Sequence, residues 1–156
     1  MTAMLTVANV FEVLGVPAPQ GSKTAVMIAG RPQVIEGRRG SGRARHKAWR
    51  HAVAEKARDV AATLDAPLDG ALYLGITFRL PMPPSRPKRA HYAGSIWHTT
   101  RPDLSKLIRT TEDALTDSGL IRDDARICWL HVTKLEVTGW TGAQITLRHA
   151  GEVDQP

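Results

Sequence analysis

The stretch from Trp97 to Asp124 constrains the fold of this chain most, because it contains an amphipathic helix bracketed by acids. With a turn of about 100° per residue from Asp103, one side carries Leu104, Leu107, Ile108, Thr111, Ala114 and Leu115. The opposite side carries Ser105, Lys106, Arg109, Glu112 and Asp113. A helix with a single apolar face has to bury that face against another element. The stretch therefore predicts a helix that begins at Asp103 and packs on a sheet or a second helix.

Strand patterns lie on both sides of this helix. Residues 71–80 (ALYLGITFRL) alternate between two sets of side chains, which is typical of a strand with one buried face. Further strands are predicted over residues 10–16, 24–29, 32–36, 127–137 and 143–149. The runs 24–29 and 32–36 can pair across Gly30 as a hairpin. The proline-rich segment PMPPSRPKR after residue 80 predicts an irregular basic loop that leads directly to Trp97.

A second helix is predicted over residues 44–64. Its apolar stripe consists of Trp49, Val53, Ala57, Val60 and Leu64. The resulting order of strands, helix, strand, helix and strands predicts a single α+β domain, with a mixed β-sheet and two main helices. We expect this domain to span residues 1–150 and residues 151–156 to form a flexible C-terminal tail.

Composition narrows the class of protein. The 156 residues include 42% hydrophobic residues, which is ordinary for a globular chain. No apolar run approaches the roughly 20 residues of a membrane helix, and the N-terminus lacks the pattern of a signal peptide, so we expect a cytoplasmic protein without a membrane partner. The single cysteine, Cys128, excludes an internal disulfide and a cysteine-based zinc site.

The charge distribution points to a polyanionic partner. The net charge is +6 and the pI is near 10.0, which favours binding to nucleic acid. One basic run contains Arg31, Arg38, Arg39, Arg43, Arg45, Lys47 and Arg50, and a second contains Arg86, Lys88 and Arg89. The glycine-rich segment GRRGSGRAR (37–45) is equally consistent with a DNA-contacting loop and with a solvated surface loop, and such loops often become ordered on binding.

The acids of the central stretch suggest a divalent metal site. Asp103 occupies the N-cap position of the predicted helix, and this alone is consistent with an ordinary capped helix. Arg109 and Asp113 are four residues apart and can pair on the polar face. Asp123 and Asp124 follow the helix stop at Gly119. Converging carboxylates bind Mg²⁺, which can activate water and stabilise the departing oxygen of a phosphodiester.

The segment PDLSKLIRTTEDALTDSGLIRDDARI resembles the core motif of the RusA family of Holliday junction resolvases. The resemblance covers most of the domain, and about 28 residues carry the specific motif. It implies a RusA-like fold and a homodimeric, Mg²⁺-dependent endonuclease, with Mn²⁺ as a possible substitute. Such an enzyme resolves four-way DNA junctions by paired symmetric nicks in recombination and repair. The resemblance also implies a bacterial protein of the kind common in phages and prophages.

The resemblance also assigns roles to individual residues. Asp103 and Asp124 match catalytic, metal-binding acids of the family, Asp123 matches the first acid of the late pair, and Asp113 matches the acid of the D-A-L segment. Arg109 stands where the family has a catalytic Lys. This exchange keeps the charge, but an arginine cannot give up its proton.

Three other departures affect the expected site. Ser105 replaces the second acid of the motif, so that it either binds a metal through water or leaves Asp113 or Asp123 to supply the missing charge. Lys106 replaces an Asn and is grouped with the DNA-contacting cations. Arg126 replaces a Gln after the late acid pair. His98, five residues before Asp103, is a candidate water-orienting or phosphate-contacting residue, or a loop histidine without such a role.

Two other functions stay open from the sequence. The replacement at Ser105 is also consistent with a DNA-binding protein that has lost cleavage. A different metal nuclease, acting on RNA or flapped DNA, has the same acids and basic runs.

Overall fold

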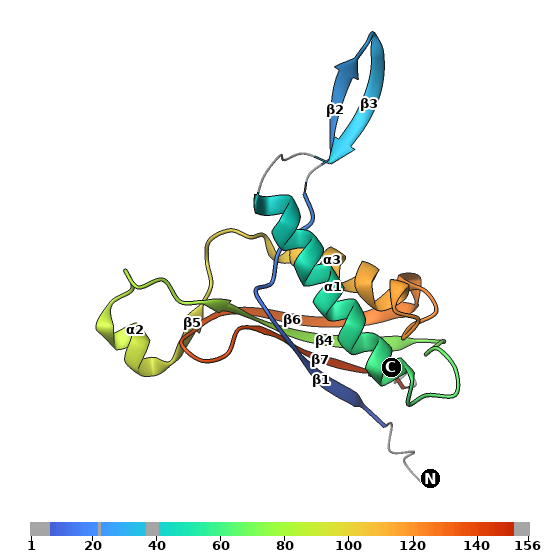
Figure 1. Ribbon diagram of the computed structural model, residues 1–156. Coiled ribbons are helices and arrows are strands. Elements are labelled where there is room, and N and C mark those ends of the chain that lie inside the picture. The colour runs from blue at the N-terminus through green and yellow to red at the C-terminus, as the bar shows by residue number, and fades with distance from the viewer. Residues whose placement is uncertain (1–6, 22, 37–40, 152–156) are drawn as a thin grey trace, which may run out of the picture.

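The protein folds into a mixed five-stranded sheet with two helices on one of its faces (Figure 1). The computed structural model describes residues 7–21, 23–36 and 41–151. In sheet order, the strands are β1 (Asn9–Leu14), β7 (Gly142–His149), β4 (Leu72–Pro81), β6 (Ile127–Val137) and β5 (Ser95–Trp97). Strands β4 and β6 run parallel, whereas the other neighbours run antiparallel. The predicted α+β fold with a mixed sheet is confirmed.

Strand β4 forms the centre of the sheet, between β7 and β6, and its side chains alternate as the sequence predicted. Leu72, Leu74 and Phe78 are fully buried on the face that the helices cover. Tyr73 and Thr77 point to the other face and stay partly exposed. The covered face therefore contains the hydrophobic core.

The helices bury the predicted apolar stripes. Helix α1 (Ser41–Ala61) begins and ends three residues before the predicted range of 44–64, and it buries Trp49, Val53 and Ala57. Helix α3 (Leu104–Asp117) begins directly after Asp103 and buries Leu107 and Leu115 completely. The two helices pack against each other.

The predicted hairpin is also present, but it is not part of the main sheet. Strands β2 (Lys23–Ile28) and β3 (Arg31–Glu36) pair only with each other and stand away from the domain body (Figure 1). Ala29 and Gly30 connect them with φ values of 51° and 75°. Positive φ at both central residues is the requirement of a type I′ hairpin turn.

The connection from β4 to α3 differs from the prediction. We expected an irregular loop as far as Trp97, but this connection contains the short helix α2 (Lys88–Ala93) and strand β5. Only Ala90 of α2 is buried, so the helix has no apolar period that the sequence could reveal. Gly94 ends it in the left-handed conformation, which a residue without Cβ adopts readily.

An ion pair fastens this connection to the sheet. The Glu136 side chain of β6 is 1% exposed, and both of its carboxylate oxygens accept hydrogen bonds from Arg86, at 2.7 and 2.6 Å. The bond from Arg86 holds the pKa of Glu136 below its usual range. A buried carboxylate needs such a partner because burial otherwise disfavours its charged form.

Two further expectations concern the ends and the environment of the chain. Residues 152–156 of the predicted tail lie outside the described residues. Within the described ranges, no helix is both long enough and apolar enough to span a bilayer.

We predict that Arg86→Ala lowers the melting temperature by several degrees at neutral pH, because it leaves the Glu136 carboxylate buried without its partner. Since the folded-state pKa of Glu136 is depressed, the stabilisation exists above the unfolded-state pKa and disappears as pH falls through the folded-state value. The difference between wild type and Arg86→Ala should therefore shrink in acid.

Thermal denaturation as a function of pH measures this effect. Arg89→Ala, on exposed α2, is the matched control, and Arg86→Ala with Glu136→Gln should recover part of the loss. Equal melting temperatures for Arg86→Ala and Arg89→Ala at neutral pH would contradict the prediction.

Candidate functional site

Asp103 lies at the N-terminus of α3 with its carboxylate exposed. Its backbone is extended, as the N-cap position requires, but its side chain makes no capping hydrogen bond. Instead it forms an ion pair with Lys106, at 3.5 Å. Lys134 of β6 fixes the preceding chain, because its Nζ donates to the carbonyl oxygens of Thr100 and Pro102, each at 2.8 Å. The sheet thus holds the start of α3 and leaves the Asp103 carboxylate accessible.

A polar stripe runs along α3 from Ser105 through Arg109 to Glu112, at spacings of four and three residues. Ser105 and Arg109 are exposed, and Glu112 is half-buried. The predicted ion pair between Arg109 and Asp113 is not among the salt bridges of the described residues. The Arg109 guanidinium therefore has no ion pair with Asp113 in this arrangement.

The late acids lie in the short helix η1 (Asp124–Arg126), which packs against α3. The Asp123 side chain caps η1 by accepting a hydrogen bond from the Ala125 N–H, at 2.8 Å. The Asp124 carboxylate is exposed. Asp123 is thus engaged in holding the turn, while Asp124 is presented to the surface.

Asp69 anchors η1 from the loop before β4. It forms ion pairs with Arg122 at 3.0 Å and Arg126 at 2.9 Å, on either side of the acid pair. The pKa of Asp69 is lowered, first by the hydrogen bond from the Gly70 N–H and then by these two arginines. Arg126 therefore has a positioning role at the place where the family motif has Gln.

Glu112 is a further acid of the site, and its pKa responds to the neighbouring acids. Burial raises its pKa, and the negative charges of Asp124 and Asp113 raise it further. We call Glu112, Asp113 and Asp124 the α3–η1 carboxylates. A divalent cation bound beside Glu112 would offset the negative charges that raise its pKa.

The structure groups these acids differently from the prediction that Asp124 lies beside Asp103. The negative charge of Asp124 acts on Glu112, which is nine residues and about 13 Å along α3 from Asp103. Among the residues that the structure describes, no three His, Cys, Asp or Glu side chains are arranged to hold a metal ion. The donors nevertheless fit Mg²⁺, because this ion is usually bound by one or two carboxylates together with substrate phosphates and water.

The predicted DNA-contacting cations fall into three groups. Arg43, Arg45 and Lys47 are exposed in the first turns of α1, and Lys88 and Arg89 are exposed on α2. Arg86 is engaged with Glu136, and Lys106 is paired with Asp103. Arg38 and Arg39 lie outside the described residues.

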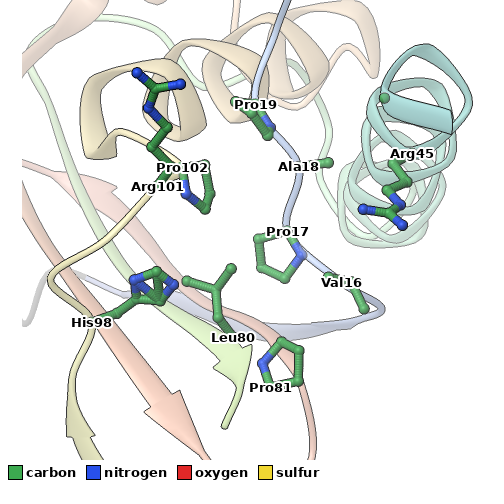
Figure 2. A pocket seen from close by; sticks show the side chains of 11 residues that line it. Val16, Pro17, Ala18, Pro19, Arg45, Leu80, Pro81, His98, Arg101 and Pro102 are labelled. Atoms are coloured by element: carbon green, nitrogen blue, oxygen red, sulfur yellow. The ribbon is translucent and has the colours of Figure 1, made fainter. Parts of the chain in front are cut away.

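His98 lies between β5 and α3, where its backbone N–H donates to the carbonyl oxygen of Lys134 at 3.1 Å. Its Nδ1 is buried without a hydrogen-bond partner. Burial lowers its pKa, and the charge of Lys134 lowers it further, so the imidazole is neutral at neutral pH. The ring lines a pocket in front of α3 (Figure 2).

Sequence reasoning did not assign a role to Glu112, Lys134 or Asp69. Glu112 was detectable as part of the polar face of α3, two turns after Ser105. Lys134 and Asp69 carried no signal, because their contacts with residues around 100 and 124 depend on how the strands pair. The sequence therefore revealed the exposed acids but not the side chains that position them.

The chain matches the model of a known protein family. The model of this family, described as "Endodeoxyribonuclease RusA", matches residues 25–148, a range that includes most of the hairpin, both main helices and the acids. A comparison with curated protein sequences found no match.

We predict that Glu112→Gln raises the melting temperature at about pH 8 but not at about pH 4. Because the folded-state pKa of Glu112 is raised, the folded protein binds more protons than the unfolded chain as pH rises past the ordinary value, and stability declines there. A neutral amide avoids this cost. Glu55→Gln on exposed α1 is the matched control, and a stabilisation of Glu112→Gln that does not depend on pH would contradict the explanation.

Proposed function

We propose, since the chain belongs to the RusA family of endodeoxyribonucleases, that it resolves four-way DNA junctions by paired symmetric nicks in recombination and repair. Membership of the family implies Holliday junction resolvase activity, and nucleases of this family generally depend on a divalent metal. The proposal adds that the ion is Mg²⁺, with Mn²⁺ as a substitute, and that the active form is a homodimer. It also assigns the residues that carry the reaction.

One observation carries the proposal beyond the family match. Where η1 packs on α3, burial raises the pKa of the half-buried Glu112, and the negative charges of Asp124 and Asp113 raise it further, on a chain whose net charge is +6. A metal-dependent nuclease needs acidic side chains on an otherwise basic surface. The acids bind the cation, and the surrounding Lys and Arg side chains attract the DNA backbone.

The acids have distinct proposed roles. Asp103 and Asp124 are the essential carboxylates at the two ends of the site, and Glu112 takes over the charge that the family places at the position of Ser105. Asp113 adds negative charge beside Glu112. Asp123 stays a cap of η1, as its hydrogen bond to Ala125 supports. A divalent ion bound by the α3–η1 carboxylates would activate water and stabilise charge on the scissile phosphate.

The cations act on the phosphates. Arg109 lies on the exposed face of α3 between Ser105 and Glu112, where its guanidinium can offset charge that grows on the phosphate in the transition state. The exposed Arg and Lys side chains of α1 and α2 contact the DNA backbone, and these contacts make binding dependent on salt. These side chains are Arg43, Arg45, Lys47, Lys88 and Arg89.

Dimerisation has support from the uncovered face of the sheet. Trp129 is 52% exposed, makes an edge-to-face contact with Tyr73 at a ring-centre separation of 5.0 Å, and lies under Arg148. Exposed aromatic and arginine side chains are enriched in protein interfaces, so we propose this end of the sheet as part of the contact between two copies.

We predict that Asp103→Asn and Asp124→Asn each reduce Mg²⁺-dependent cleavage by about a hundredfold or more, because each removes an acid that the family motif makes essential, and even the loss of an outer partner of a metal site costs up to about a hundredfold. Both variants should still bind the junction, since the basic surface is unchanged. The assay uses a labelled four-way junction with and without Mg²⁺, and it maps paired nicks. Asp59→Asn on exposed α1 is the control, and full cleavage by either site variant would refute the proposal.

A second function, binding without cleavage, has a specific observation in its favour, because Ser105 is an exposed hydroxyl where the family motif has an acid. We predict that Ser105→Asp raises the cleavage rate, by about tenfold if the extra ligand tightens metal binding. Comparison of wild type and Ser105→Asp on the same junction in Mg²⁺ and in Mn²⁺ measures this. Junction binding without cleavage by wild type in either ion would favour the second function, especially if Ser105→Asp then cuts.

A further inference from the structure

A pocket of about 280 Å³ lies next to the start of α3 (Figure 2). Segments far apart in the chain form it: residues 16–19 after β1, the first turn of α1, the end of β4, His98, and residues 101–102 before α3. Its volume is close to the lower limit of about 300 Å³ for sites that bind small molecules. The pocket therefore fits a single ring system rather than a side of a duplex.

The walls of this pocket are apolar and formed largely by rings. Four of the lining residues are prolines: Pro17, Pro19, Pro81 and Pro102. Leu80 is buried at 5% exposure, and Figure 2 shows it between Pro17 and His98. The imidazole of His98 adds the one aromatic ring of the wall. Flat apolar walls of this kind favour the face of a planar ring.

The charge of the lining is entirely positive. Arg45 and Arg101 lie on opposite sides of the pocket in Figure 2, both exposed, and none of the eleven lining residues is acidic. A ligand that suits the site therefore combines a planar ring with an anionic group. A nucleotide has this combination, with the base against the proline rings and phosphates near the two guanidinium groups.

The position of the pocket indicates where the nucleotide comes from. Pro102 lines the pocket and directly precedes Asp103, which the proposed function makes an essential acid. We infer that the pocket receives one unstacked nucleobase of the DNA strand that is cut, beside the scissile phosphate. This inference rests on the proposed function, but it concerns a site that none of the proposed catalytic residues forms.

Such a pocket would help to distinguish a branch point from continuous duplex. Removing a base from a stack costs least where its pairing or stacking is already disturbed, as at the crossover of a junction. A continuous duplex has to break intact stacks to fill the same pocket. The pocket would therefore position the strand for cleavage mainly where the helices meet.

Gly42 makes the inference testable. It lines the pocket, and a Cβ placed on it would have nothing within 4 Å, so a larger side chain can occupy the space without displacing the fold. Gly42→Leu is the blocking variant and Gly42→Ala is its matched control. Val16→Phe blocks from a second wall, where the residue is 52% exposed. Ala44→Leu adds the same bulk on an exposed part of α1 outside the pocket.

The first readout needs no cleavage. Junctions with 2-aminopurine at successive positions around the crossover are bound in EDTA, and fluorescence reports unstacking of that base. We expect an increase at one position with wild type, Gly42→Ala and Ala44→Leu, and no increase with Gly42→Leu or Val16→Phe, although all five proteins bind. The same increase with both blocking variants, or no increase with wild type at any position, would overturn the inference.

The second readout is cleavage in Mg²⁺ of junctions in which that nucleotide is abasic. Wild type should lose about tenfold in rate when the base is removed, as for one specific base contact, and Gly42→Leu should cut both substrates equally slowly. An equal loss in wild type and Gly42→Leu would overturn the inference. If wild type unstacks the base but never cuts, the proposed function fails while the base pocket stands.

Free nucleotides provide the remaining control. Deoxycytidine and deoxyadenosine monophosphates are added at millimolar concentration while the NMR signals of the His98 ring are followed. Absence of a saturable change supports a pocket that works only on DNA. If a free nucleotide binds saturably and also abolishes the fluorescence increase on the junction, the pocket is a site for free nucleotides, and the assignment to DNA is overturned.

Discussion

The parallel pairing of β4 with β6 is the constraint on which the rest of the structure depends. Parallel neighbours cannot be joined by a tight turn, so the chain has to cross over the sheet between them, and α3 forms the main part of that crossover. Lys134, late in β6, holds the start of α3, while η1 leads from its other end into the first residue of β6. The acids at the two ends of α3 are therefore positioned by one pair of strands.

Charged side chains that come from the sheet and its loops do most of the positioning. Glu136 fixes the proline-rich connection through Arg86, and Asp69 fixes the acid-bearing turn through Arg122 and Arg126. The acids Asp103 and Asp124 stay exposed because other groups form these anchoring contacts. The anchoring ion pairs fix the segments around the site, and the carboxylates stay accessible. A site for a metal and a phosphate requires both.

The sequence predicted the architecture well where one segment contained the whole pattern. The alternation of residues 71–80, the stripe of α1, the hairpin around Gly30 and the start of α3 after Asp103 are confirmed. The irregular loop expected up to Trp97 is wrong in its second half, because α2 and β5 are short and have no clear period of their own. The roles of Asp103, Asp124 and Arg109 stay predictions, although the family to which the motif pointed is confirmed.

By itself, the sequence determined the family, the fold class and the exposed acids, because helix faces, strand alternation and motif spacing are local properties of the chain. Only the tertiary structure decided which acids influence one another, because the packing of η1 on α3 lets the charge of Asp124 act on Glu112. It also decided the anchors Asp69, Lys134 and Glu136, and the pocket beside Asp103. The anchors and the pocket join segments tens of residues apart, and the pairing of β4 with β6 brings these segments together.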